Sequence, residues 1–211
     1  MKVLLVNGSP NQKGCTNRAL EEIARTLAEE GMSSEIFWVG KKPISGCIAC
    51  HRCEELGACV FQDVLVPFME KAREADGFIF GSPVHYAAAG GAITSLLDRA
   101  CFSDLMVTGS QAFYLKPAAA VVAARRAGTT AALDQLNKYF TIQEMPVISS
   151  CYWNMVHGNT PEEVEQDQEG LMVMRTLARN MAWFLKVKEA GRRAGVPMPQ
   201  REEPVATNFI R

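Results

Sequence analysis

The sequence lacks a charge excess, a long apolar run and any internal repeat. Lys and Arg number 22 against 23 Asp and Glu, so the formal net charge is −1. This balance predicts no basic face for nucleic acid. No stretch approaches the roughly 20 consecutive apolar residues that span a bilayer. The opening MKVLLVNGSP is too short an apolar run for a secretory signal peptide. We therefore expect a cytoplasmic protein that binds neither membranes nor nucleic acid.

Cysteine is sparse outside one short segment. Of the seven cysteines, four fall within thirteen residues, at Cys47, Cys50, Cys53 and Cys59. In a reducing compartment, such a bunch favours metal binding or redox chemistry over a disulfide framework. The remaining three are expected to be small buried hydrophobes: Cys15, Cys101 and Cys151.

Apolar runs alternate with amphipathic ones along the 211 residues, and 48% of the residues are hydrophobic. This pattern predicts a single α/β domain over residues 1–191, with a cysteine-rich loop at 46–60 and a tail at 192–211. Buried strands are predicted at 2–7, 34–39, 77–81, 117–123 and 146–151. Helices are predicted at 16–31, 64–75, 92–100, 129–139 and 161–190.

Five strands with intervening helices imply a doubly wound parallel sheet in three layers, α/β/α. In the strand order 2-1-3-4-5 the order reverses between the first and third strands. Ligands of such sheets bind beyond the carboxyl ends of the strands at that point. Two loops meet there, at 8–17 and 82–91, and they are the candidate site.

The first loop, GSPNQKGCTN at 8–17, joins the first strand to the first helix. Small and hydroxylic residues let backbone amides converge on a phosphate, and the helix N-terminus adds partial positive charge. Ser9, Thr16 and Asn17 can also donate side-chain hydrogen bonds. The pattern matches neither G-x-G-x-x-G nor a Walker A box. The alternative is an ordinary strand-to-helix turn in which Thr16 caps the helix.

The second loop begins with Ser82-Pro83-Val84-His85-Tyr86. Pro83 stiffens the turn, and Tyr86 offers an aromatic face. Backbone amides here could hold the polar edge of a flat ring, and His85 can exchange a proton at neutral pH. The alternative is that His85 and Tyr86 merely close the loop over the core.

Three motifs together resemble a known family. They are a strand followed by GSP-x5-T-N, a strand followed by GSPVHY, and C-x2-C-x2-C-x5-C between them. The chain resembles the flavodoxin-like NAD(P)H-dependent FMN reductases, in particular their iron–sulfur flavoprotein branch. The resemblance covers roughly residues 1–160. It implies a flavodoxin-like fold and FMN without a covalent link.

The resemblance also implies which residues contact FMN. Its phosphate would lie on Ser9, Gly14, Thr16 and Asn17. Its isoalloxazine ring would lie against Pro83, Val84, His85 and Tyr86. A third contact would come from the loop after the fourth strand, at Ala124, Arg125 and Gly128. The Arg125–Arg126 pair departs from the small residues usual in the family, and a pair that merely faces solvent is the alternative.

The cysteine spacing leaves three alternatives. A [4Fe–4S] cluster needs four thiolates. Two-residue gaps let one tight loop wrap three irons, and the fourth ligand needs a longer reach. Cys47, Cys50, Cys53 and Cys59 satisfy that requirement. Zinc could use the same ligands, although structural zinc usually clips two separated pairs. The third alternative is no metal, with the cysteines as thiols or a redox pair.

We therefore expect an FMN-dependent oxidoreductase that takes electrons from NAD(P)H, or from a ferredoxin through the cluster. It would pass them to a quinone, oxygen or another acceptor. Because the flavin carries the chemistry, no catalytic residue is predicted. The resemblance implies a homodimer or homotetramer. One alternative is a non-enzymatic electron carrier, which the balanced charge disfavours. Another is a cofactor-free binding or regulatory domain.

Overall fold

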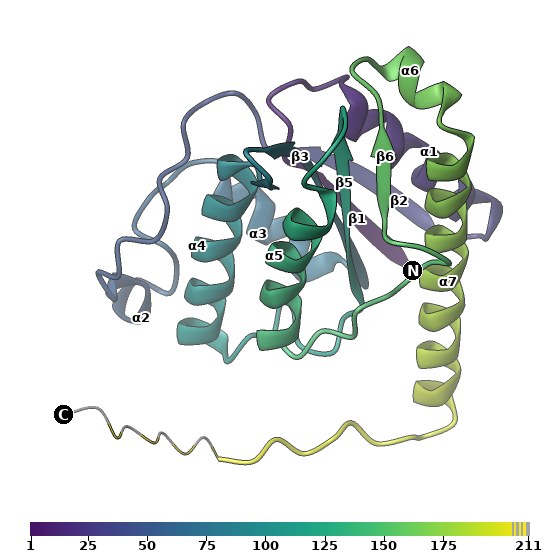
Figure 1. Ribbon diagram of the computed structural model, residues 1–211. Helices are drawn as coiled ribbons and strands as arrows, with labels where there is room; N and C mark the ends of the chain where they lie inside the picture. Colours follow the sequence, from purple (N-terminus) through teal and green to yellow (C-terminus); the bar gives the residue numbers. More distant parts are fainter. Residues whose placement is uncertain (204, 206, 208, 210–211) are drawn as a thin grey trace.

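The computed structural model describes residues 1–203, 205, 207 and 209 and places them in three layers (Figure 1). Two layers of helices enclose a mostly parallel sheet. Its parallel strands follow the order β2-β1-β3-β5-β6. Their bounds are β1 Lys2–Asn7, β2 Ser33–Trp38, β3 Gly77–His85, β5 Ala118–Ala124 and β6 Met155–His157. The predicted order 2-1-3-4-5 is therefore confirmed for the parallel strands.

The sheet has one strand more than the predicted five. The short β4 (Ala88–Ala89) pairs antiparallel with the end of β3, so β3 runs on to His85 instead of ending at Gly81. Tyr86 and Ala87 form the turn, and both have positive φ, 49° and 59°. That is the backbone of a type I′ hairpin, which usually carries Asn or Gly. The hairpin was not predicted because neither residue is present.

The fifth parallel strand lies later in the chain than the predicted 146–151. Val147 keeps one isolated bridge to Ala118, after which the chain leaves the sheet and returns as β6, where Met155 pairs with Val122. Between these two pairings the chain carries four more residues than β5 does. The hydroxyl of Ser150 stabilises this excursion by donating to Tyr152 O at 2.6 Å. The apolar run PVIS at 146–149 therefore corresponds only to the isolated bridge at Val147, not to the strand β6.

Helices cover both faces of the sheet (Figure 1). One face is covered by α1 (Cys15–Glu29), α6 (Pro161–Gln166) and α7 (Gln168–Arg193). The other is covered by α3 (Leu65–Glu74), α4 (Gly91–Thr108) and α5 (Thr129–Ile142). The short α2 (Arg52–Leu56) lies in the cysteine segment, outside both layers. No described helix is both long and apolar enough to span a bilayer.

The core has two halves, one on each side of the sheet. In β1, Leu4 and Val6 face α3, α4 and α5, whereas Val3 and Leu5 face α1 and α7. All four side chains are fully buried, as expected of a parallel strand covered on both faces.

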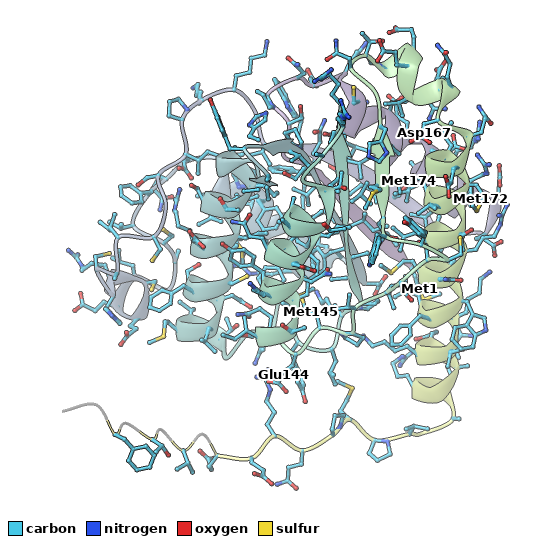
Figure 2. The ribbon with its side chains drawn as sticks, in the orientation of Figure 1. Met1, Glu144, Met145, Asp167, Met172 and Met174 are labelled. Atoms are coloured by element: carbon cyan, nitrogen blue, oxygen red, sulfur yellow. The ribbon has the colours of Figure 1, made fainter. Side chains whose placement is uncertain are left out.

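The predicted last helix, 161–190, is two helices. The break falls at Asp167, at the junction of α6 and α7 (Figure 2). Its carboxylate accepts from the backbone N–H of Gly170 at 2.9 Å and from that of His157 at 2.7 Å. Asp167 therefore caps α7 and ties its start to β6.

The tail after α7 lies at the end of the molecule opposite the carboxyl ends of the strands (Figure 1). There the guanidinium of Arg201 lies 3.7 Å from the ring centroid of Tyr114 and 2.7 Å from the carboxylate of Glu144. Of the predicted tail 192–211, residues 204, 206, 208, 210 and 211 lie outside the described residues.

Candidate functional site

The loop at 8–17 is braced by its own polar groups. The side-chain oxygen of Asn7 accepts from Ser9 N at 3.0 Å, and the Ser9 hydroxyl accepts from Asn11 N at 3.1 Å. The indole N–H of Trp38 donates to the Ser9 carbonyl at 2.8 Å. Gly8 N donates to the carbonyl of Gly81 at 2.9 Å and so joins this loop to β3. The chain itself therefore fixes the shape of the loop.

The first helix, α1, begins at this loop without a side-chain cap. Gly14 is the N-cap, and no described side chain accepts from the first N–H groups of the helix. Thr16 lies inside the helix and is buried, so the alternative in which it caps α1 is wrong. Free N–H groups with the partial positive charge of the helix suit an anion. Asn17 differs, because its side chain accepts from Asn7 at 3.2 Å and donates to Glu21 at 2.7 Å.

A cavity of about 430 Å³ opens beside this loop. Residues 11–15 line it, together with Trp38 and residues 159–161. Two of the residues that line it, Lys13 and Lys41, are positively charged, and Gly14 and Cys15 at the start of α1 line the same cavity. Lys41 and residues 159–161 were not predicted as part of the site. They lie far from the loop in sequence, and only the end of β2 and the β6–α6 connection bring them here.

The second predicted loop is the β3–β4 hairpin. Pro83 and Val84 are half-buried in β3, whereas His85 is exposed and Tyr86 is fully exposed. The alternative in which His85 and Tyr86 close over the core is therefore wrong. A non-glycine turn with two positive φ angles carries backbone strain, a feature that clusters at functional sites.

The third predicted loop follows β5 and contacts that hairpin. Ala124 ends the strand, and the side chains of Arg125 and Arg126 are exposed. Gly128 has φ +93°, and a Cβ there would lie 2.6 Å from the Cα of Ala87. Only glycine permits this conformation and this approach. All three loops therefore meet at the carboxyl edge of the sheet, as the strand order predicts.

The cysteine segment leaves the sheet after β2 and runs along the outside of α4 (Figure 1). Cys53 is buried, Cys59 is half-buried, and Cys47 and Cys50 are exposed. Together the four line one small cavity of about 20 Å³. Burial raises the pKa of the Cys53 thiol, and the neighbouring Cys50 and Cys59 raise it further against two opposing backbone N–H groups.

Four thiols are a donor set that suits an iron–sulfur cluster or zinc. In the described part of the chain, however, no three His, Cys, Asp or Glu side chains are already gathered in a metal-binding arrangement. The four cysteines therefore suit a metal site because they are thiols that line one cavity. Their sulfur atoms, however, are not already arranged around a common centre.

The other three cysteines differ from one another. Cys101 is buried, as predicted, and burial raises the pKa of its thiol to about 12. Cys15 is half-buried, and its thiol lies 3.5 Å from the carbonyl oxygen of Gly158. Cys151 is exposed, so the expectation that it is buried is wrong. It lies on the excursion before β6, which the apolar pattern did not reveal.

Comparison with known proteins extends this picture. Residues 1–160 match the family described as NADPH-dependent FMN reductase. An iron–sulfur flavoprotein of Methanocaldococcus jannaschii is 30% identical over 192 residues, which cover 89% of this chain and 98% of that protein.

Two solved structures share the fold. RosB with bound 8-demethyl-8-formylriboflavin-5′-phosphate has a TM-score of 0.70 and 15% identity, covering 99% of this chain and 92% of that one. A flavodoxin from the domain Archaea has a TM-score of 0.58 and 13% identity, covering 88% and 99%. The predicted flavodoxin-like fold class is confirmed.

Proposed function

Because this chain belongs to the NADPH-dependent FMN reductase family and is an FMN-dependent oxidoreductase, we propose that it passes electrons from NAD(P)H through FMN to an acceptor such as a quinone or oxygen. We further propose that its clustered cysteines hold an iron–sulfur cluster. Bound FMN supplies the redox chemistry. The chain binds the cofactor, orients its ring and sets its electrostatic surroundings.

The observation that carries the FMN proposal is the uncapped start of α1 beside a cavity with two lysines. Free backbone N–H groups and ammonium groups together hold a phosphate. In this proposal the phosphate lies on Ser9, Gly14, Thr16 and Asn17. Because Asn17 already donates to Glu21 and accepts from Asn7, it has one amide N–H left for the phosphate.

The ring is proposed to lie over the hairpin and the adjoining third loop. Its contacts would be Pro83, Val84, His85, Tyr86, Ala124, Arg125 and Gly128. The exposed aromatic face of Tyr86 suits stacking on a flat ring. The exposed Arg125 is available for an anionic substrate, and the phosphates of a nicotinamide nucleotide are of that class.

Titration of FMN into the full chain tests the cofactor site. We expect stoichiometric quenching of flavin fluorescence. Thr16→Val should weaken binding by at least about tenfold, because a hydrogen bond to a charged group contributes about 1.5–3 kcal/mol. The matched control is Thr26→Val, a buried threonine on the same helix whose hydroxyl donates to its own helix at Glu22 O. Flavin that stays fluorescent and dialyses away from the wild-type chain would contradict the proposal.

Anaerobic mixing separates the enzyme from the electron carrier. We expect NADPH or NADH alone to bleach the flavin absorbance rapidly. Reduction by reduced ferredoxin only would instead identify a carrier between protein partners. The comparison of NADH with NADPH in the same experiment identifies the preferred donor.

The cluster is supported by the 30% identical relative named as an iron–sulfur flavoprotein and by the shared cavity of the four thiols. Anaerobically purified chain should contain about four iron and four sulfide per flavin. Zinc without sulfide would show that the four cysteines form a zinc site. Free thiols without metal would show that they bind no metal. Light scattering on the same sample tests the predicted homodimer or homotetramer.

A further inference from the structure

Arg99 of α4 is a buried arginine that contacts the cysteine segment on both sides of its cysteines. Its exposed fraction is 1%. One guanidinium nitrogen, Nη1, lies 3.5 Å from the carbonyl of Ser45, which precedes the first cysteine. Nη2 donates to the carbonyl of Phe61, after the last cysteine, at 3.1 Å. Arg99 therefore connects the two ends of the segment across α4.

Three more contacts surround this guanidinium. Asp63 accepts from Nη1 at 2.7 Å and from Nη2 at 3.0 Å in a bidentate pair. Nε donates to the sulfur of Cys59 at 3.3 Å. The guanidinium also lies 5.0 Å from the centroid of the Phe61 ring. Among the described residues, every side-chain hydrogen bond of the guanidinium is therefore with residues 45–63.

Burying an arginine is energetically unfavourable, because the desolvation free energy of its charge must be offset by hydrogen bonds and an ion pair. An apolar side chain would pack α4 against the segment at lower cost. The segment has only the five-residue α2 as regular structure, so these bonds are a large part of what orders it. The donor aimed at a cysteine sulfur adds a chemical role, since N–H bonds to sulfur tune iron–sulfur centres.

We propose that Arg99 is a positioning residue for the cysteine segment. It closes the segment around one cavity lined by all four thiols, and its Nε–H bond to Cys59 raises the reduction potential of the bound cluster. The first part concerns the chain itself. The second part rests on the proposed iron–sulfur cluster.

Alkylation of the metal-free full chain tests the first part. Cys53 is buried, and the hydrogen bond that Arg99 donates to a thiol goes to Cys59 instead, so the reaction of Cys53 with iodoacetamide reports opening of the segment. We expect Arg99→Met to speed this reaction at least about tenfold at fixed pH, as for loss of a buried ion pair. Arg99→Lys, which retains the charge without the planar fork, should give an intermediate rate.

Two controls guard this comparison. Arg52→Met removes an exposed arginine of the same segment, paired with Glu55 at 3.3 Å, and should leave the rate unchanged. Cys101, buried in α4, reacts only when the domain unfolds, so its rate separates local opening from global unfolding. Equal Cys53 rates in wild type and Arg99→Met overturn the positioning role. If Arg99→Met fails to fold, the same rates are compared in Arg99→Lys.

An anaerobic redox titration followed by electron paramagnetic resonance tests the second part. Loss of a positively charged donor disfavours the added electron, so Arg99→Met should lower the one-electron reduction equilibrium constant about tenfold, or about 59 mV. Arg99→Lys keeps the charge and loses only the Nε–H donor to Cys59, so its potential should fall by less. An unchanged potential overturns the role of the sulfur bond. Wild-type chain that binds no iron and sulfide refutes the cluster and with it this second part, whereas the Cys53 rates still decide the first.

Discussion

The proposed phosphate loop, residues 8–17, and the cysteine segment, residues 45–63, are held in place in different ways. The loop at 8–17 continues a central strand, and bonds from Asn7, Trp38 and Gly81 brace it from three sides. The cysteine segment leaves an edge strand and lies outside the helical layers, where Arg99 supplies its buried polar contacts. The first region is therefore fixed to the sheet, and the second is attached to the outside of α4. Substitutions at the edge of the sheet should affect stability or flavin binding, whereas those in the attached segment should affect metal alone.

The largest expected effect is the loss of iron binding without any loss of FMN binding. Cys53→Ser should abolish iron binding, because a cluster loses one of its four thiolates. Flavin binding should stay unchanged, because Cys53 lies in the attached segment. Iron and sulfide assays with FMN titration measure both. Cys151→Ser, an exposed thiol on the excursion before β6, is the control and should retain full iron. Loss of FMN along with iron in Cys53→Ser would break the comparison.

Gly128→Val should affect stability and flavin together. A side chain at φ +93° is strained, and its Cβ would clash with Ala87 of the hairpin. We expect a loss of about 2–3 kcal/mol in the free energy of unfolding and at least about tenfold weaker FMN binding. Denaturant unfolding and FMN titration measure the two.

Gly195→Val is the matched control for Gly128→Val. Gly195 has φ +78°, but a Cβ there meets nothing within 4 Å. It should lose about 1 kcal/mol and keep its FMN affinity. Equal FMN affinity in both variants would mean that the third loop does not support the flavin site.

Glu22→Gln tests the support beneath the phosphate loop, where α1 meets α7. Burial alone would raise the pKa of the Glu22 carboxyl, but Arg175, Arg18 and Arg25 outweigh it and hold the pKa below the usual 4.5. The resulting stabilisation is present above pH 4.5 and is lost as the pH falls through the lowered pKa.

Unfolding measured from pH 7 down to pH 3 checks that sign. The variant should be about 2 kcal/mol less stable at pH 7, and its stability should fall less steeply in acid than that of wild type. Parallel stability curves for the two proteins would show that Glu22 does not contribute to the acid limb.

The smallest effect concerns the two cavity lysines. Lys13→Ala and Lys41→Ala should each weaken FMN binding about two- to fivefold, since an exposed charge contributes up to about 1 kcal/mol. The effect should shrink at high salt because the charges are screened. Lys42→Ala, an exposed neighbour that does not line the cavity, is the control. Equal losses in all three variants would indicate a general charge effect.

Local patterns in the sequence determined the fold class, the order of the parallel strands and the meeting of the three loops. Apolar runs such as KVLLVN and PAAAVVA mark strands buried on both faces, and strand order follows from the α/β alternation. The GSP and SPVHY segments follow two of those strands, so their convergence is a consequence of topology. The spacing of the four candidate cysteine ligands is likewise visible in the sequence, because all four lie on one loop.

Other features depend on contacts between segments that are distant in sequence, and local patterns do not predict them. The Tyr86–Ala87 turn contains no glycine, and its strain is supported by Gly128, which is distant in sequence. Lys41 joins the phosphate loop only because β2 pairs with β1. In the sequence, Arg99 is an ordinary polar residue of a predicted helix. In the structure, residues 45 and 59–63 surround its guanidinium. Hydrophobic periodicity indicates which face of a helix or strand is buried, but it does not identify the residues that pack against that face.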